Sequence, residues 1–434
     1  MTPDPRGRRV RAALENQYLP PSPGFDERMR SALHHAPVGS WRPRWGVEVA
    51  AAVLALLAIL TLTLPKVLPT ATHAPIAKPT PMPTVVPKEP VFSGGPPSLQ
   101  LMSNGVAWFS AGQNVYRSTD GGAQWTNVSP PAESGVSEAA FALDSAHAWV
   151  AVPMTQTSQP WNAVTFYATG DGGRTWQRLG SFPIAGSWLH QITFVDSSHG
   201  WLLVSLGAAT GSEAISVWGT TDGGHTWREL ARSPMPQQAE TPGQLSSACD
   251  KNGISFISDT TGWVTGVCAG GAPFLERTID GGHTWQSQAL PVAYGQSLEY
   301  SASVAPPIFA DQSLGILPAT MAIGPGVQPA IVLYVTRDGG RSWTATTPVR
   351  SGRVATSAGP GEWVVVAAPS QILFTRDGQR YEQFPSDTDL SQIVGVSFSD
   401  SHRGLALIFV TSGGFRLLRT ADGGAHWSPV AVSS

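Results

Sequence analysis

The segment TIDGGHTW, residues 278–285, brings together residue types that acid–base and metal chemistry use. Asp280 offers a carboxylate, His283 an imidazole that titrates near neutral pH, and Thr278 and Thr284 offer hydroxyls. Such a set could form an active site or a metal site. The same letters return as TTDGGHTW at residues 220–227, however, and a catalytic centre is not usually needed twice.

The segment is one of seven boxes with the pattern Ser/Thr-x-Asp-Gly. Successive box aspartates are separated by 51, 51, 58, 58, 39 and 45 residues, and they are Asp120, Asp171, Asp222, Asp280, Asp338, Asp377 and Asp422. Six boxes end on a tryptophan: Trp125, Trp176, Trp227, Trp285, Trp343 and Trp427. The sixth box has Gln379 for the second glycine and Tyr381 near the aromatic position, so we expect the sixth repeat to be the least regular.

A second motif precedes most boxes and consists of an apolar strand, a polar turn and another apolar strand, as in ITFVDSSHGWLLV at residues 192–204. With the two strands around the box, each repeat holds four predicted strands. Periods of about 40 to 50 residues with this content indicate the blades of a β-propeller. The first and last repeats both contain four predicted strands, so we expect the ring to close without exchanging a strand.

The chemistry of the box is that of a tight turn. The aspartate can accept backbone N–H groups, glycine can adopt positive φ, and the tryptophan can pack against the neighbouring sheet. The histidines at 225, 283 and 426 occupy positions that hold Arg or Ala in other boxes. Single carboxylates in separate turns cannot supply the several oxygen ligands that calcium requires. We therefore expect no catalytic residue, metal or cofactor in the boxes.

The box pattern resembles the Asp-box, or bacterial neuraminidase, repeat of the sialidase-like superfamily, over residues 98–434. Combined with the F-x-D-x-x-x-G-W strands, it looks like the photosystem II stability/assembly-factor type of propeller. That resemblance implies an all-β, seven-bladed β-propeller. It also implies a non-enzymatic binding role outside the cytoplasm, with the boxes on the face opposite the ligand.

Composition agrees with many short strands joined by turns, since the chain has 46 Gly, 37 Pro and 16 Trp but only 13% charged residues. The predicted organisation has four parts. Residues 1–45 form a short basic cytoplasmic segment, residues 46–64 a transmembrane helix, residues 65–97 a proline-rich extracytoplasmic linker, and residues 98–434 the propeller. A cleaved signal peptide is the alternative to the membrane anchor.

Charge sets the predicted orientation and excludes one class of partner. Eight Arg precede the apolar span, which favours a cytoplasmic N-terminus and an extracytoplasmic propeller. From residue 98 onward, 15 Arg and Lys251 face 24 Asp and Glu. A propeller with this acidic balance does not suit nucleic acid, so we expect a protein partner.

A glycoside hydrolase, such as a cell-surface exo-sialidase, is the enzymatic alternative. A sialidase needs an arginine cluster, a Tyr–Glu pair and an acid/base aspartate. Seven arginines lie in or beside boxes, on the face away from ligand: Arg117, Arg174, Arg277, Arg337, Arg341, Arg376 and Arg419. Glu299 and Tyr300 are adjacent, and neighbours on a strand point to opposite sides.

Two further predictions concern the remaining residues. Cys249 and Cys268 flank a predicted hairpin in near register, so we expect a disulfide, with two buried thiols as the alternative. The loops opposite the boxes carry aromatic and acidic side chains that we expect to form a binding face: Trp161, Glu213, Glu240, Tyr294 and Tyr300.

Overall fold

A computed structural model of the protein describes residues 97–112, 114–131, 139–154, 162–209, 211–235, 238–268, 272–293, 301–322, 328–411 and 414–433. The predicted cytoplasmic segment, the transmembrane helix and all of the linker but Pro97 lie outside these ranges. In the described ranges, no helix has the length and apolar character needed to cross a bilayer.

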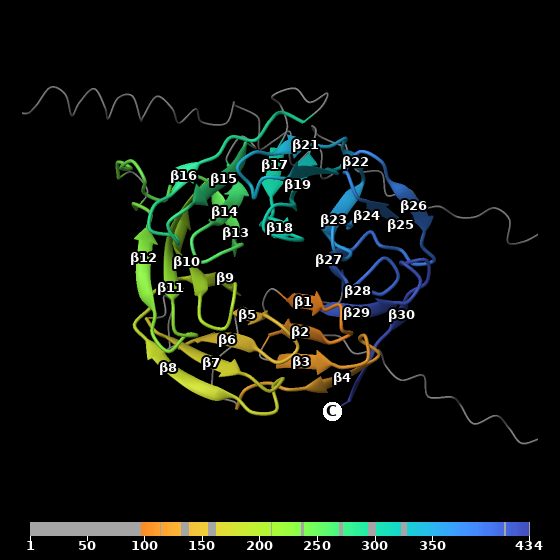
Figure 1. The fold of residues 1–434 in the computed structure, drawn as a ribbon, viewed down its shortest axis with the longest axis horizontal. Helices are drawn as coiled ribbons and strands as arrows, with labels where there is room; N and C mark the ends of the chain where they lie inside the picture. Colours follow the sequence, from red (N-terminus) through yellow and green to blue (C-terminus); the bar gives the residue numbers. More distant parts are fainter. Residues whose placement is uncertain are drawn as a thin grey trace, which may run out of the picture. The chain divides into compact units, whose positions relative to one another are not determined.

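Seven sheets follow one another around a ring, as Figure 1 shows, and within each blade consecutive strands pair antiparallel. Blade 1 contains β1 (Ser98–Leu101), β2 (Ala107–Ala111), β3 (Asn114–Ser118) and β4 (Gln124–Asn127). Blade 2 contains β5 (Ala139–Ala142), β6 (Ala148–Pro153), β7 (Val164–Thr169) and β8 (Gln177–Phe182). Blade 3 contains β9 (Trp188–Phe194), β10 (Gly200–Ala209), β11 (Ser212–Thr220) and β12 (Arg228–Arg232).

The later blades repeat this order. Blade 4 contains β13 (Asp250–Phe256), β14 (Gly262–Val267), β15 (Pro273–Thr278) and β16 (Gln286–Ser287). Blade 6 contains β23 (Gly352–Ser357), β24 (Trp363–Ala367), β25 (Gln371–Thr375) and β26 (Glu382–Pro385). Blade 7 contains β27 (Ile393–Phe398), β28 (Gly404–Phe409), β29 (Phe415–Thr420) and β30 (Ser428–Pro429). The predicted all-β, seven-bladed β-propeller is confirmed.

Blade 5 keeps four strand positions but interrupts two of them. Its members are β17 (Ser301–Val304), β18 (Ile308–Phe309), β19 (Gly315–Ala322), β20 (Ala330–Thr336), β21 (Thr344–Ala345) and β22 (Val349–Arg350). Both β17 and β18 pair with β19, and both β21 and β22 pair with β20. The first and fourth positions of this blade are therefore each split in two.

The ring closes through a strand that the sequence did not predict. β31 (Ala431–Ser433) pairs in parallel with β4, so blade 1 becomes a five-stranded sheet in the order β1-β2-β3-β4-β31. In Figure 1 the C-terminus accordingly lies beside β4. The expectation of closure without strand exchange is wrong, because the last residues continue past β30 and add to the open edge of β4.

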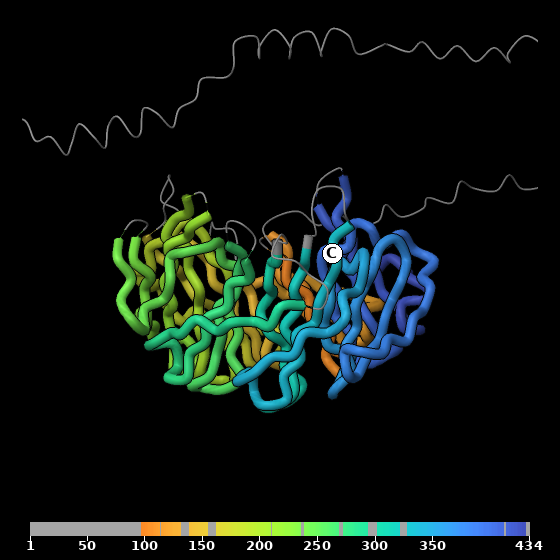
Figure 2. The backbone as a smooth tube through the Cα atoms, turned by 90° about the horizontal axis from the view of Figure 1, so that it is seen from above, coloured from red at the N-terminus to blue at the C-terminus, as the bar shows by residue number. Residues whose placement is uncertain are grey.

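The strands run between two faces of the ring, which Figure 2 shows edge-on. On one face, the first glycine of each regular box donates its N–H to the turn between the first two strands of the same blade, as Gly281 does to the Thr260 carbonyl at 2.8 Å. We call this the box face. Connections between the second and third strands reach the opposite end, as do the ends of the fourth strands, and we call that end the loop face.

The F-x-D-x-x-x-G-W motif describes how neighbouring blades pack. Phe194 on β9 covers Gly200 on β10, where an added Cβ would lie 2.4 Å from the ring. The opposite face of the Phe194 ring stacks on Trp149 of the preceding blade, with centroids 3.8 Å apart. Phe256 stacks on Trp201 in the same way at 3.7 Å. The phenylalanine and glycine therefore pair within a blade, and the tryptophan packs against the phenylalanine of the next blade.

Blade 6 inverts this pair and shortens its box. The position of the small residue is taken by Trp363, which pairs with Ser357 and Thr375 and is completely buried. In its box, the hydroxyl of Thr375 accepts the N–H of Gly378, three residues on, whereas the regular boxes use the residue four positions on. The box of the sixth repeat is irregular, as predicted, and its turn is shorter by one residue. The prediction that this repeat is the least regular is wrong for the sheet, because blade 6 keeps four unbroken strands and blade 5 has two split ones.

Candidate functional site: the loop face

The box aspartates serve the turns that contain them. In the fourth box, Asp280 Oδ1 accepts the N–H groups of His283 and Thr284 at 3.1 and 2.9 Å, and Oδ2 accepts the Thr284 hydroxyl at 2.6 Å. Burial acts to raise the pKa of Asp280, but these hydrogen bonds hold it below its ordinary value. The indole of Trp285 is buried and donates to the Gly282 carbonyl at 2.9 Å. His283 is exposed.

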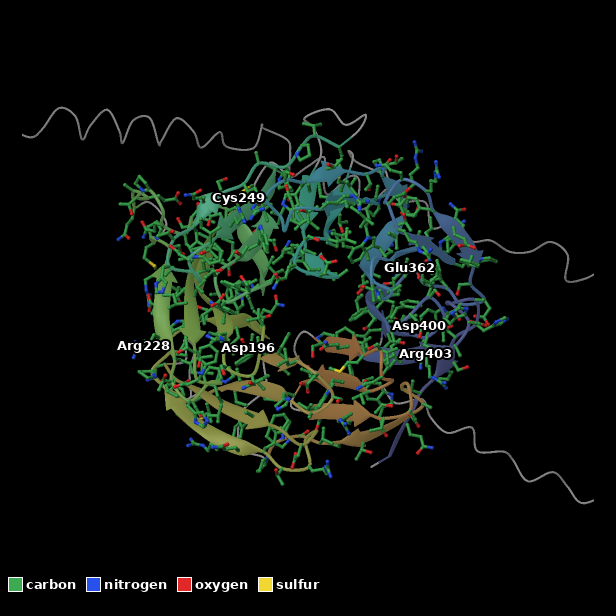
Figure 3. All side chains as sticks on the ribbon, in the orientation of Figure 1. Asp196, Arg228, Cys249, Glu362, Asp400 and Arg403 are labelled. Atoms are coloured by element: carbon green, nitrogen blue, oxygen red, sulfur yellow. A yellow bond between two sulfur atoms is a disulfide. The ribbon has the colours of Figure 1, made fainter. Side chains whose placement is uncertain are left out.

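The aspartates of the second motif act in the same way at the box face. Asp196 and Asp400, labelled in Figure 3, each accept two backbone N–H groups of the turn that follows. Arg403 also pairs with Asp400 at 2.7 Å. Across the described ranges, no group of histidine, cysteine and acidic side chains is arranged to hold a metal ion.

The inner strands surround a cavity of about 500 Å³. Its lining includes Pro97, Gln100, His190, Gln191, Thr356 and Ser397, so most of its polar groups are uncharged. Some of these side chains bond to the open edge of a neighbouring blade. Ser397 accepts the Leu101 N–H at 2.8 Å, and Gln191 accepts the Ile254 N–H at 3.1 Å. The cavity therefore has a polar wall whose side chains also tie adjacent blades together.

A cluster of ionisable side chains lies buried at the loop-face end of blades 3 and 4. His190 Nε2 lies 2.7 Å from Glu213 Oε1, and the backbone N–H of Lys251 donates to Glu213 Oε2 at 2.8 Å. Glu213, Lys251 and Glu276 are only 2%, 4% and 5% exposed. The Lys251 ammonium lies 4.4 Å from the centre of the Phe274 ring.

Burial dominates the electrostatics of this cluster. It lowers the pKa of Lys251 to about 8, although the charges of Glu213 and Glu276 oppose the shift. Burial raises the pKa of Glu276 to about 7, against the hydrogen bond from the Ser246 N–H and the charge of Lys251. Burial also acts to raise the pKa of Glu213, but the hydrogen bond and charge of His190 bring it below its ordinary value. Glu213 is therefore ionised beside Lys251 at neutral pH, whereas Glu276 is only partly ionised there.

The cluster fixes the chain that enters β13. Lys251 Nζ donates to the carbonyls of Ala248 and Cys249 at 2.7 and 2.8 Å, and Glu276 Oε2 accepts the Ser246 N–H at 3.2 Å. Cys249 and Cys268 form a disulfide, with Cα atoms 4.1 Å apart, as the hairpin register predicted. Cys249, labelled in Figure 3, has a φ of 71°, a conformation that few residues other than glycine adopt.

The predicted binding-face residues divide into three groups. Trp161, Tyr294 and Tyr300 lie outside the described residues. Glu240 is exposed, and its Oε1 accepts the Ser246 hydroxyl at 2.7 Å and the Ser247 N–H at 3.0 Å. Glu213 does not belong to an exposed binding face, because its side chain points into the buried cluster. The alternation of inward and outward positions along a strand could not predict the burial of Glu213, since its partners come from β9 and β13.

Sequence reasoning missed His190, Lys251 and Glu276. Each lies on a different strand, and the register between blades brings them together only in the folded ring. It also missed Trp188, the first residue of β9, which is 38% exposed at the loop face. Its indole Nε1 lies 3.2 Å from His190 Nε2. The one available signal was an isolated lysine, since Lys251 is the only lysine after residue 88.

Comparisons with known proteins find similarity in structure alone. No protein-family model and no curated protein matches the sequence. A structure of YCF48 bound to D1 peptide is 15% identical, with 77% of this chain and 94% of that chain covered and a TM-score of 0.49. YCF48 from Cyanidioschyzon merolae is 16% identical, covering 77% and 96%, with a TM-score of 0.46.

Glycoside hydrolases are also among the similar structures. The α-L-arabinofuranosidase Arb93A from Fusarium graminearum is 14% identical, with 67% of this chain and 90% of that chain covered and a TM-score of 0.39. All three likenesses are likenesses of fold. The seven sheets of this chain themselves establish it as a β-propeller.

Proposed function

We propose that the protein is a membrane-anchored, non-catalytic binding module of the assembly- or stability-factor type, which docks a protein partner outside the cytoplasm. The distribution of exposed apolar side chains supports the proposal. Six large apolar side chains are exposed among the described residues. Three of them, Trp188, Val394 and Phe409, lie at strand ends on the loop face, and Met235 and Val292 lie in the connections that follow β12 and β16. The loop-face side chains come from blades 3 and 7 and offer separate apolar contact points to a protein partner on that face.

The box face offers a contrast. Its one exposed large apolar side chain among the described residues is Ile279, inside the fourth box. Its aspartates accept hydrogen bonds from their own turns, and their pKa values are held down, as for Asp338 and Asp422 at about 2. These carboxylates remain ionised and engaged throughout the neutral range. The carboxylates of the box face are therefore engaged in holding their hairpins.

One observation favours a glycoside hydrolase as the second candidate. Glu213 and Glu276 belong to one cluster, and their pKa values are displaced in opposite directions, as in an acid/base carboxylate pair. Their surroundings favour a structural role instead. They are 2% and 5% exposed, and their partners are backbone N–H groups, His190 and Lys251. A substrate would have to displace these partners.

Two experiments test the proposal. In the first, the intact protein is crosslinked in its own membranes, and its capture is compared with that of Trp188→Ser, Phe409→Ser and the box-face control Ile279→Ser. We expect a specific partner to be lost from the two loop-face variants and kept by the control. Equal capture by all three variants would count against the loop face.

In the second experiment, the full chain is incubated with fluorogenic sialosides and other glycosides. We expect no turnover above that of a Glu213→Gln, Glu276→Gln double variant. Clear turnover by the wild type alone would sink the non-catalytic proposal and favour the hydrolase.

A further inference from the structure

Trp188, Glu240 and Asp250 are linked at the loop-face side of blades 3 and 4 by a chain of contacts that runs through Glu213. Trp188 neighbours His190, and His190 neighbours Glu213. The Glu213 carboxylate accepts the N–H of Lys251, the residue after Asp250, and the Glu213 N–H donates to the Ser247 carbonyl at 2.9 Å. Ser247 in turn donates its N–H to Glu240. An exposed indole and two exposed carboxylates therefore share one buried support.

The basic side chains in this region are already committed. The segments around the rim are residues 183–190, 206–217 and 231–252. In their described parts, the arginine and lysine residues are Arg232 and Lys251. Arg232 donates from Nε and Nη2 to the two carboxylate oxygens of Glu229, both at 2.6 Å. The Lys251 ammonium is buried against carbonyls and the Phe274 ring. The exposed charge of the rim is consequently negative.

An exposed indole beside exposed carboxylates favours a positively charged ligand. An indole face attracts guanidinium and ammonium groups, and nearby carboxylates add charge-assisted hydrogen bonds. The support beneath the rim reduces the cost of ordering it on binding, because the Glu240 carboxylate and the chain at Asp250 are held before a ligand arrives. Met235, 50% exposed in the segment after β12, adds apolar surface in the same connection.

We propose that the rim formed by Trp188, Glu240 and Asp250 binds a partner segment that presents arginine side chains between apolar ones. The inference rests on the proposed function, since it names the chemistry of the partner that the loop face takes. Arginine side chains of the segment stack on the Trp188 indole or pair with the Asp250 and Glu240 carboxylates. Adjacent apolar residues of the segment contact the exposed apolar groups of the loop face.

The test uses the purified full-length protein in detergent and two fluorescein-labelled peptides, Gly-Arg-Leu-Arg-Leu-Arg-Gly and the same peptide with Glu for each Arg. By fluorescence anisotropy we expect the arginine peptide to bind at least about tenfold more tightly, and less tightly as salt is raised. Trp188→Ala and Asp250→Asn should each weaken it by about fivefold or more. The matched control is Asp259→Asn, an exposed carboxylate in a box-face turn of blade 4.

Equal affinity for the two peptides, or no effect of Asp250→Asn, would overturn the inference. The crosslinking experiment then separates the two claims. Partner capture that depends on Trp188 and Phe409 but not on Asp250 would leave the proposed function standing and remove the arginine-recognition claim. Capture that is unaffected by substitution of Trp188, Phe409 and Asp250 would contradict both the proposed function and the arginine-recognition claim.

Discussion

At the scale of single residues, Glu276 carries the clearest consequence of burial. Its ordinary pKa is 4.5, and burial raises this value to about 7 in the folded protein. The folded state therefore keeps a proton that the unfolded chain has released. Lys251 shows the complementary case, because burial lowers its pKa from 10.5 to about 8. Both groups thus cost stability in the window between pH 7 and pH 8, where each is largely charged.

The sign of the pH dependence follows from proton linkage. From about pH 4.5 to pH 7, the folded protein binds more protons at Glu276 than the unfolded chain, so the free energy of unfolding decreases as the pH rises. The Asp338 and Asp422 carboxylates contribute nothing in this window, because their lowered pKa values affect stability only below about 3.8. We expect the wild-type Tm to fall by a few degrees from pH 5 to pH 7.

A glutamine variant isolates this contribution. Glu276→Gln keeps an acceptor for the Ser246 N–H and removes the ionisation, so the difference in Tm between variant and wild type should grow in favour of the variant from pH 5 to pH 7. Glu382→Gln, at an exposed carboxylate on β26, is the control and should leave the difference constant. A parallel response of the two variants would show that Glu276 does not titrate in this range.

At the scale of elements, the pairing of phenylalanine with glycine determines how each blade begins. A Cβ on Gly262 would lie 2.5 Å from the Phe256 ring, and that ring is already stacked on Trp201 of the preceding blade. We expect Gly262→Ala to destabilise the protein by about 1–3 kcal/mol, the usual cost of overpacking. The midpoint of urea unfolding measures the effect.

Gly395→Ala is the matched control, because it also places a methyl group on an inner strand but with its nearest neighbour 3.7 Å away. It should be nearly neutral. Adding Phe256→Leu to Gly262→Ala should recover part of the loss, since the two substitutions act on one contact. Equal destabilisation by Gly262→Ala and Gly395→Ala would contradict the packing account.

The same contact explains what the sequence could and could not predict about the elements. The boxes and the F-x-D-x-x-x-G-W strands repeat at fixed spacing, so the blades and their turns were predictable. Trp363 was not, because it fills the place of a glycine only when Ser357 replaces the phenylalanine opposite it. Glu213 was placed wrongly for a related reason: its burial depends on His190 and Lys251, which lie in different strands of two blades.

At the scale of the whole molecule, seven similar blades leave one junction that must join the two ends of the chain. β31 brings Ala431, Val432 and Ser433 beside Gln124, Trp125 and Thr126 of β4. No repeat signal marks residues 431–433, because in the part of the chain that the structure describes the fourth strands of the other blades pair with no such extra strand. The motifs therefore predicted the number of blades, but they could not predict how the ring closes.

Removing this strand tests how much the closure contributes. Deletion of residues 431–434 leaves the β4 edge unpaired and lets blades 1 and 7 separate more easily. Each backbone hydrogen bond contributes about 0.5–1.5 kcal/mol, so we expect a loss of about 2–4 kcal/mol and a lower Tm in thermal unfolding of the full-length protein. Amide exchange at β4 should become faster, while exchange at β14, on the far side of the ring, changes little.

Deletion of Ser434 alone is the control and should leave both measurements unchanged. If the longer deletion behaves like the control, the inter-blade packing of Leu405 and Trp125 closes the ring by itself, and β31 only covers an edge.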